Sequence, residues 1–311
     1  MKRREFVAAA ASVMFVPSPK TGPYQDPTYV RELARRVAAD RYERGGALGV
    51  LSAMRHIRQI RSAVDSSDKE LHVAASGLAV ESVYTLNDAG RFDAGQKVGE
   101  LALELAQLSG ETEAQSRALS VLARVHYHRG DGGMAVKYAQ RGARLHDVPP
   151  RQHTWLKLRH GWSLSIVNGQ EHQARNALDD VQAGLADAPE GSLDTGDLMG
   201  SVGRAFYDLG EYRRAQDCLE EAMQLLEGSS PQLHGIFLAR QIAASLRAAQ
   251  PEFAADRMLS LARVVPLVNS DQLNNNVKDV LAASHPWRTV PEVRAARAQL
   301  HSVWTGASIS A

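Results

Sequence analysis

Arginine and tyrosine side chains recur at fixed distances before a series of turns, and their chemistry suits a carboxylate-bearing partner. They fall 13, 10, 6 or 3 residues before each turn, and this 3-4-3 spacing lies along one helix face. Arginine binds carboxylates through a planar fork of N–H groups. The pattern predicts a groove for an acidic protein or peptide, formed by Arg117, Arg124, Tyr127, Arg159, Arg204, Tyr207, Arg240 and Arg247. The alternative is an ordinary solvated helix face in an arginine-rich chain.

Three consecutive asparagines, Asn274 to Asn276, add a second candidate. Asparagine is a poor helix former, so such a run needs a reason. One interpretation is that side-chain amides, Asn275 among them, clamp a peptide backbone in the groove. The alternative, which helix propensity favours, is a weak or late helix start.

The sequence predicts no catalytic residue, no metal site and no cofactor. His126 and His128 are two residues apart on a helix and so point to different faces. The glycine-rich segment 129–135 lacks the Gly-Lys-Ser/Thr ending of a phosphate loop, and Cys218 has no suitable histidine partner. We therefore expect a protein that is not an enzyme, and an enzyme with an unrecognised site is the least favoured alternative.

Composition sets broad limits on function. The chain has 311 residues, a net charge of +1 and one cysteine. A nearly neutral chain gives no global field for nucleic acid or membranes. Alanine, leucine, arginine, glutamate and glutamine dominate, which favours helix over strand.

The helices and turns that position the arginines recur along the sequence. Turn glycines recur at Gly90, Gly130, Gly169 and Gly210, with Gln250 as the fifth equivalent, at spacings of 40, 39, 41 and 40 residues. A small residue follows each turn position by five, where two helices would cross closely. The pattern therefore predicts that each unit is a helix, a tight turn and a second helix. Such hairpins must stack on their neighbours to bury their apolar faces.

The predicted fold is all-α, a right-handed superhelix of helical hairpins (an α-solenoid). Residues 1–25 would form an apolar arm or a signal-like segment, and 26–65 an N-terminal capping helix pair. Residues 66–304 would hold about six hairpins with a degenerate last pair, and 305–311 a flexible tail.

The fourth unit resembles the tetratricopeptide (TPR) family. Its matching residues are Met199, Val202, Gly203, Phe206, Gly210, Tyr212, Ala215, Leu219 and Ala222. The other units match less closely, and the third has Trp162 where a small residue is usual. The resemblance implies a concave groove lined by the first helix of each hairpin.

The wider layout resembles the C-terminal part of actinobacterial transcriptional regulators that combine a helix-turn-helix domain with a TPR-like array. The similarity rests on the "RRxF" and alanine-rich start and on the helix break from Asp40 to Gly46. The helix-turn-helix domain is absent from this sequence, so the resemblance implies no direct DNA binding. It implies a regulatory role through a protein or peptide, with a separate helix-turn-helix protein as a further candidate partner.

The N-terminal segment leaves two locations open. Arg3, Arg4 and Phe6 followed by an apolar run are similar to a twin-arginine export signal. The run is too short to span a bilayer, and prolines crowd the place where a peptidase would cut. We expect a cytoplasmic protein without a membrane span, and a twin-arginine-exported scaffold of the cell envelope is the alternative.

Overall fold

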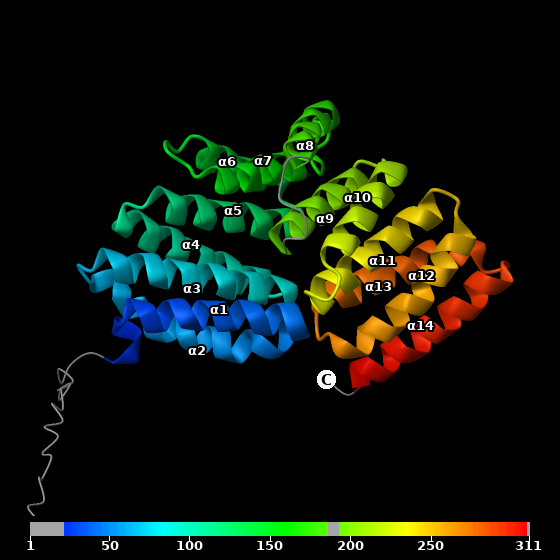
Figure 1. Cartoon of the computed structure of the whole chain (residues 1–311), viewed down its shortest axis with the longest axis horizontal. Coiled ribbons are helices and arrows are strands. Elements are labelled where there is room, and N and C mark those ends of the chain that lie inside the picture. Colours follow the sequence, from blue (N-terminus) through cyan, green and yellow to red (C-terminus); the bar gives the residue numbers. More distant parts are fainter. Residues whose placement is uncertain (1–21, 186–192, 310–311) are drawn as a thin grey trace, which may run out of the picture.

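The chain forms an all-α helical-repeat solenoid, as the sequence predicts (Figure 1). The computed structural model describes residues 22–185 and 193–309, which contain 14 α-helices and no strand. The helices are α1 (Pro27–Arg44), α2 (Val50–Ile60), α3 (Lys69–Asp88), α4 (Phe92–Ser109), α5 (Thr112–His128), α6 (Gly132–Ala143), α7 (Pro150–Leu164), α8 (Glu171–Leu185), α9 (Leu193–Asp208), α10 (Tyr212–Leu225), α11 (Pro231–Arg247), α12 (Pro251–Val264), α13 (Asp271–Ala283) and α14 (Pro291–Ile309).

Consecutive helices pair as antiparallel hairpins, from α3–α4 through α11–α12. The first helices of neighbouring hairpins also pack on one another, and α13 and α14 extend the stack by packing on α11 and α12. No helix in the described ranges is long and apolar enough to cross a membrane.

Most of the 1–25 segment lies outside the described residues. Within 26–65 the structure has α1, α2 and two short 3₁₀ helices, Ala47–Gly49 and Arg61–Asp65. The expected tail from residue 305 continues α14 as far as Ile309.

Left-handed residues end the first helix of each hairpin where the sequence places a turn. Gly90, Gly130, Gly169 and Gly210 have φ between 65° and 78°, a conformation that glycine adopts without steric cost. In the fifth hairpin this role falls to Ala249, with φ of 59°, and not to the expected Gln250. Gln250 instead occupies the position before the first residue of α12.

Small residues allow the helices of a hairpin to cross closely. A Cβ atom added to Gly203 would lie 2.8 Å from Leu219 Cγ on α10. Ala135, Ala174 and Ala215, five residues after their turn glycines, have no exposed surface. These positions therefore set the distance between paired helices.

The two ends of the array meet at a polar contact that we call the clasp, formed by residues 42–47, Asp88, Ser230 and 269–270. The backbones of Arg44, Ala47 and Asn269 exchange two hydrogen bonds, with N···O distances of 2.7 and 3.1 Å. The buried carboxylate of Asp88 accepts hydrogen bonds from the Gly46 amide at 2.6 Å and the Ser270 hydroxyl at 2.7 Å. Segments more than 180 residues apart in the sequence are thus joined.

The clasp closes the solenoid on itself. Contacts run from α1 to α3, α5, α7, α9 and α11, and α11 returns to contact α1. Figure 1 shows α1 in blue ending beside α11 in yellow. These six helices therefore surround the inner surface, which an open array would expose.

The close helix crossing has a measurable consequence for stability. We expect Gly203→Ala to lower the free energy of unfolding by about 1 kcal/mol, because overpacking costs about 1–3 kcal/mol and outweighs the gain in helix propensity. Gly77→Ala is the matched control, since Gly77 is also inside a helix but has open space around its Cβ position. Gly77→Ala should stabilise by about 0.5–1 kcal/mol. Urea unfolding followed by circular dichroism measures both changes, and equal shifts would contradict the close-crossing interpretation.

Candidate functional site

The inner helices carry stacked arginine and aromatic side chains, which we call the interior cluster. Guanidinium carbons lie 4.0–5.7 Å from the centroids of the rings that they face, within the range of cation–π attraction. The members are Arg41, Tyr42, Tyr84, Arg124, Tyr127, Trp155, Arg159, Trp162, Arg204, Tyr207, Tyr212, Arg240 and Arg247.

Trp162 lies at the centre of the interior cluster and is 1% exposed. The guanidinium carbons of Arg159, Arg204 and Arg124 are 4.8, 5.4 and 5.5 Å from a Trp162 ring centroid. The Tyr127 ring is 4.1 Å away between centroids. One buried indole therefore holds three cations from three different helices.

The structure brings together most of the side chains that the sequence predicts for the groove. The residues that join the interior cluster are Arg124, Tyr127, Arg159, Arg204, Tyr207, Arg240 and Arg247. Arg159 and Arg240 are almost fully buried, whereas Arg247 is exposed. The predicted stripe therefore forms an enclosed inner wall in its middle and reaches solvent only at its ends.

Two predicted residues lie outside the interior cluster. Arg117 is 39% exposed and forms an ion pair of 3.1 Å with Glu81, which also pairs with Arg41 at 3.4 Å. Asn275 is exposed and accepts a hydrogen bond from Lys278. Its neighbour Asn276 is the asparagine that turns inward, because α13 packs that face onto α11.

The set of α7 residues that face the interior differs from the predicted set by a shift of about one residue. The 3-4-3 spacing places Leu156 on the inner face, but Leu156 is fully buried against α6, where it approaches Gly142. Trp155, Arg159 and Trp162 face inward instead. Gly161 makes the close approach to α8, with Leu178 3.1 Å from its Cβ position. Trp162 at a normally small position was the sequence signal of this rotation.

In the first unit the same spacing predicts Tyr84 and Asn87, six and three residues before Gly90, on the inner stripe, and the structure confirms only one of them. Tyr84 contacts Arg41 and Arg124, as expected for an inner residue. Asn87, its predicted companion, points toward α4, with its Oδ1 2.8 Å from the Cβ position of Gly95. Glu81 occupies the inner face and was not predicted.

Some cations of the interior cluster have polar partners. Arg204 Nε donates to Tyr127 Oη at 3.1 Å, and that hydroxyl donates to the carboxylate of Asp208. Arg240 donates to Asn276 Oδ1 at 2.8 Å and lies 3.8 Å from Asp279. These contacts connect α5 with α9 and, separately, α11 with α13.

Other buried donors have no partner among the described residues. All three guanidinium nitrogens of Arg159 lack a hydrogen bond, and this side chain is 1% exposed. The Nε atom of Arg124, Nη1 of Arg204 and the indole Nε1 of Trp162 are also unpartnered. Buried donors without acceptors are rare in folded proteins and each costs about 1–3 kcal/mol, more when charged. The cluster therefore has unused capacity to bind an acceptor.

Burial and mutual repulsion shift the pKa values of the cluster. The pKa of Arg124 falls to about 10, first because of burial and then because of the nearby Arg159 charge. The pKa of His128 falls well below its ordinary value for the same reason, burial followed by the charges of Arg204 and Arg124. Burial and Arg204 also lower the pKa of Arg240. Around Arg124, His128 and Arg240 the electrostatic balance thus disfavours additional positive charge. For Arg204, burial acts to lower the pKa but Tyr127 and Asp208 outweigh it, so this pKa is raised instead.

Two cavities that share lining residues lie beside the cluster. The outer cavity, which we call the mouth, has a volume of about 180 Å³ and is lined by Trp155, by two arginines and by four carboxylates. Arg117 pairs with Glu81 and Arg151 with Asp194, and the other two carboxylates are Glu113 and Asp197. The inner space, which we call the neck, has a volume of about 20 Å³ and is lined by Arg124, Trp162 and Arg204. Tyr42, Tyr84 and Asp197 line both.

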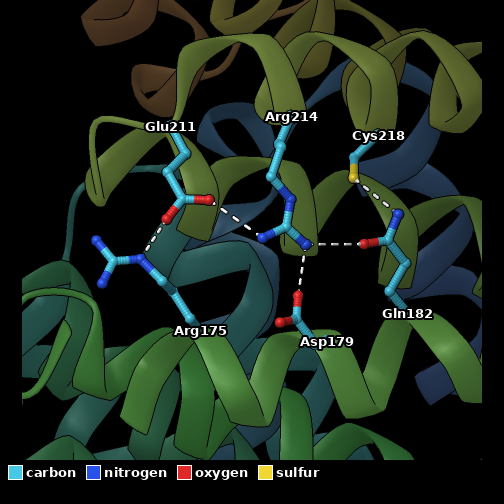
Figure 2. A network of polar contacts seen from close by, with 6 residues as sticks. All are labelled: Arg175, Asp179, Gln182, Glu211, Arg214 and Cys218. Carbon is cyan, nitrogen blue, oxygen red and sulfur yellow. Dashed lines mark hydrogen bonds and ion pairs between the residues drawn. The ribbon is translucent and has the colours of Figure 1, made fainter. Parts of the chain in front are cut away.

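A second polar network lies between α8 and α10 and has a different character (Figure 2). Glu211 and Asp179 surround Arg214, and Gln182 extends the contacts to the buried thiol of Cys218. Burial raises the pKa of Cys218 to about 12. Each charge here has an opposite partner, and the members are Arg175, Asp179, Gln182, Glu211, Arg214 and Cys218. This network joins the third and fourth hairpins, and none of its side chains is among those with a buried, unpartnered nitrogen or oxygen in the described ranges.

We predict that His128 makes the stability of the fold depend on pH. Since its pKa in the folded protein is lowered, the unfolded chain binds more protons below its ordinary pKa of about 6.5, and the free energy of unfolding should fall as pH decreases from about 7 to 5. We expect His128→Gln to reduce this slope. Urea unfolding at several pH values measures it, with the exposed His153 changed to glutamine as the control. An unchanged slope in His128→Gln would contradict the assignment.

Comparisons with known proteins support the fold and no more. No family model and no curated protein matches the chain. Among solved structures, the crystal structure of BtubC (BKLC) from P. vanneervenii is similar, with a TM-score of 0.50 and 14% sequence identity. The similarity covers 69% of this chain and 89% of BtubC. It shows a shared helical-repeat architecture.

Proposed function

We propose that this chain is a non-enzymatic, TPR-type regulatory protein that binds an acidic protein or peptide partner on its inner wall. The observation that carries the proposal is the convergence of Arg124, Arg159, Arg204 and Arg240 from four successive inner helices. Their guanidinium groups include buried N–H donors without acceptors, and carboxylates are the protein groups that best fit such donors.

The openings of the inner wall favour a chain-like partner over a compact one. Arg117 lines the mouth at one end, and Arg247 is exposed beside Tyr207 and Tyr212 at the other. An extended segment could contact both ends while an acidic group approaches the buried arginines between them. Aromatic rings at both ends supply apolar contact area for such a segment.

The regulatory part of the proposal rests on the sequence resemblance to arrays found in actinobacterial transcriptional regulators. In this proposal the chain acts in transcriptional or developmental control through its bound partner, which includes a separate helix-turn-helix protein as a candidate. The proposal places it in the cytoplasm.

Direct binding measurements test the groove. We expect a peptide array to select acidic sequences, with affinities that weaken as salt is added. The double variant Arg117→Gln, Arg247→Gln should weaken binding by at least about tenfold, because about 1.4 kcal/mol is lost with the two charged contacts. The control is Arg213→Gln, Arg263→Gln, which changes two exposed arginines on the second helices α10 and α12. Equal affinity of the test and control variants would exclude the inner wall as the binding surface.

Export is the second candidate function class, and the twin arginine at Arg3 and Arg4 before Phe6 favours it. This segment lies outside the described residues. Under the proposed cytoplasmic role we expect intact-mass spectrometry of the protein from its native cells to find residues 1–25 retained. A mass that lacks this segment, in protein recovered outside the cytoplasm, would replace the regulatory proposal with that of an exported scaffold.

A further inference from the structure

The arginines around Trp162 differ in whether a carboxylate lies close to them. Arg41 and Arg240 each have a carboxylate within 4 Å, and Arg204 connects through Tyr127 to Asp208. Among the described residues, neither Arg124 nor Arg159 has a carboxylate within that distance. Arg159 is the more buried of the two and also lacks any hydrogen bond.

Cation–π stacking offsets only part of the cost of this burial. The Arg159 guanidinium is held between Trp155 and Trp162, at 4.7 and 4.8 Å from their ring centroids. Aromatic faces attract the charge but accept none of its in-plane N–H bonds, and a buried, unpaired ion costs several kcal/mol. An anion with two or more oxygens would satisfy these N–H groups and the charge together.

We propose that the Trp162 cluster is a binding site for an oxyanion, a carboxylate or phosphate group, held by the guanidinium groups of Arg124, Arg159 and Arg204. The indole Nε1 of Trp162 is a further unpartnered donor at the same place. Five other unpartnered nitrogens belong to the three arginines. The donors come from α5, α7 and α9, so the site exists only when these three helices are stacked.

The size of the neck indicates how the oxyanion is presented. Its volume of about 20 Å³ holds about one water molecule, whereas the mouth of about 180 Å³ is larger. A terminal group in the neck meets Arg124 and Arg204, which line it. Arg159 lines neither cavity, so the group reaches Arg159 through small movements of the side chains around Trp162, while the body of the ligand stays in the mouth. This inference rests on the proposed function, and it assigns the acidic group of the partner to one buried position.

Asp197 sets the selectivity of the approach. It lines both the mouth and the neck, and it is the carboxylate whose charge acts on Arg124. An incoming anion must pass this like charge and that of Glu113, whereas Glu81 and Asp194 of the mouth are paired with Arg117 and Arg151. Like charge on the path weakens anion binding. Removing the Asp197 charge should therefore strengthen oxyanion binding, an effect opposite to that of a purely structural substitution.

Thermal unfolding of the full chain tests the site with inorganic phosphate and with acetate, each titrated in Tris-chloride at constant ionic strength. We expect a saturable rise in Tm, because a ligand that binds only the folded state stabilises it by mass action. A response to both anions, or to either one alone, supports the site and identifies which oxygen chemistry fits. The absence of any saturable response would overturn the proposal.

Variants separate specific binding from the general stabilisation that phosphate gives to proteins. Arg159→Met removes the unpaired charge and keeps the stem, so we expect it to fold at least as stably as the parent without added anion and to lose the saturable response. Asp197→Asn should lower the Kd at least about threefold. Arg213→Met, at an exposed position, is the matched control. Retention of the parent response in Arg159→Met would contradict the proposal.

Peptide affinity distinguishes this inference from the proposed function. Loss of the phosphate or acetate response in Arg159→Met, with no acidic peptide binding to the parent, would support the oxyanion site and exclude the peptide groove. Acidic peptides that bind Arg159→Met and the parent equally would support the groove and exclude the oxyanion site as the position of the acidic group.

Discussion

Closure of the helical array at Asp88 is the constraint on which the inner surface depends. The buried carboxylate accepts hydrogen bonds from Gly46 and Ser270 and so holds the end of α1 against the start of α13. Burial raises the pKa of Asp88, and the hydrogen bonds from Ser270 and Gly46 oppose that rise. Without this contact the first helices would form an open concave wall. With it, α1 and α11 meet, and the arginines between them are enclosed.

Enclosure raises the free-energy cost of burying the arginine side chains. On an open groove each guanidinium would be hydrated, and a stripe of them would be an unremarkable charged face. Inside the closed circuit, Arg159 loses its water without gaining an acceptor. Cation–π attraction to Trp155 and Trp162 replaces part of the interaction energy that the guanidinium loses with water. By contrast, Arg214 between α8 and α10 has two carboxylate partners, so the same fold does pair an arginine with carboxylates elsewhere.

Periodicity predicted the hairpins because their causes are local. Gly130 and Gly210 end helices through their own φ angles, and small residues at fixed offsets follow from the helix crossing. The one-residue rotation of α7 was missed because it depends on whether Trp162 or Gly161 faces α8, which is a packing outcome. Closure was missed for a stronger reason. It joins Asp88 to Ser270 across 182 positions, and no sequence period connects such segments. The burial of the predicted arginines could therefore not be deduced from their spacing.

Closure and ligand binding are coupled by the position of Tyr42. Its backbone carbonyl accepts a hydrogen bond from Ser230 in the clasp, and its side chain lines both the mouth and the neck. Opening the clasp would separate α1 from α11 and widen the path to Arg124, and it would also expose to water the donors on α5, α7 and α9. A ligand that neutralises the buried charges would favour the closed state by the difference in its affinity for the two states. By reciprocity, any partner that holds the clasp closed would strengthen binding at the cluster.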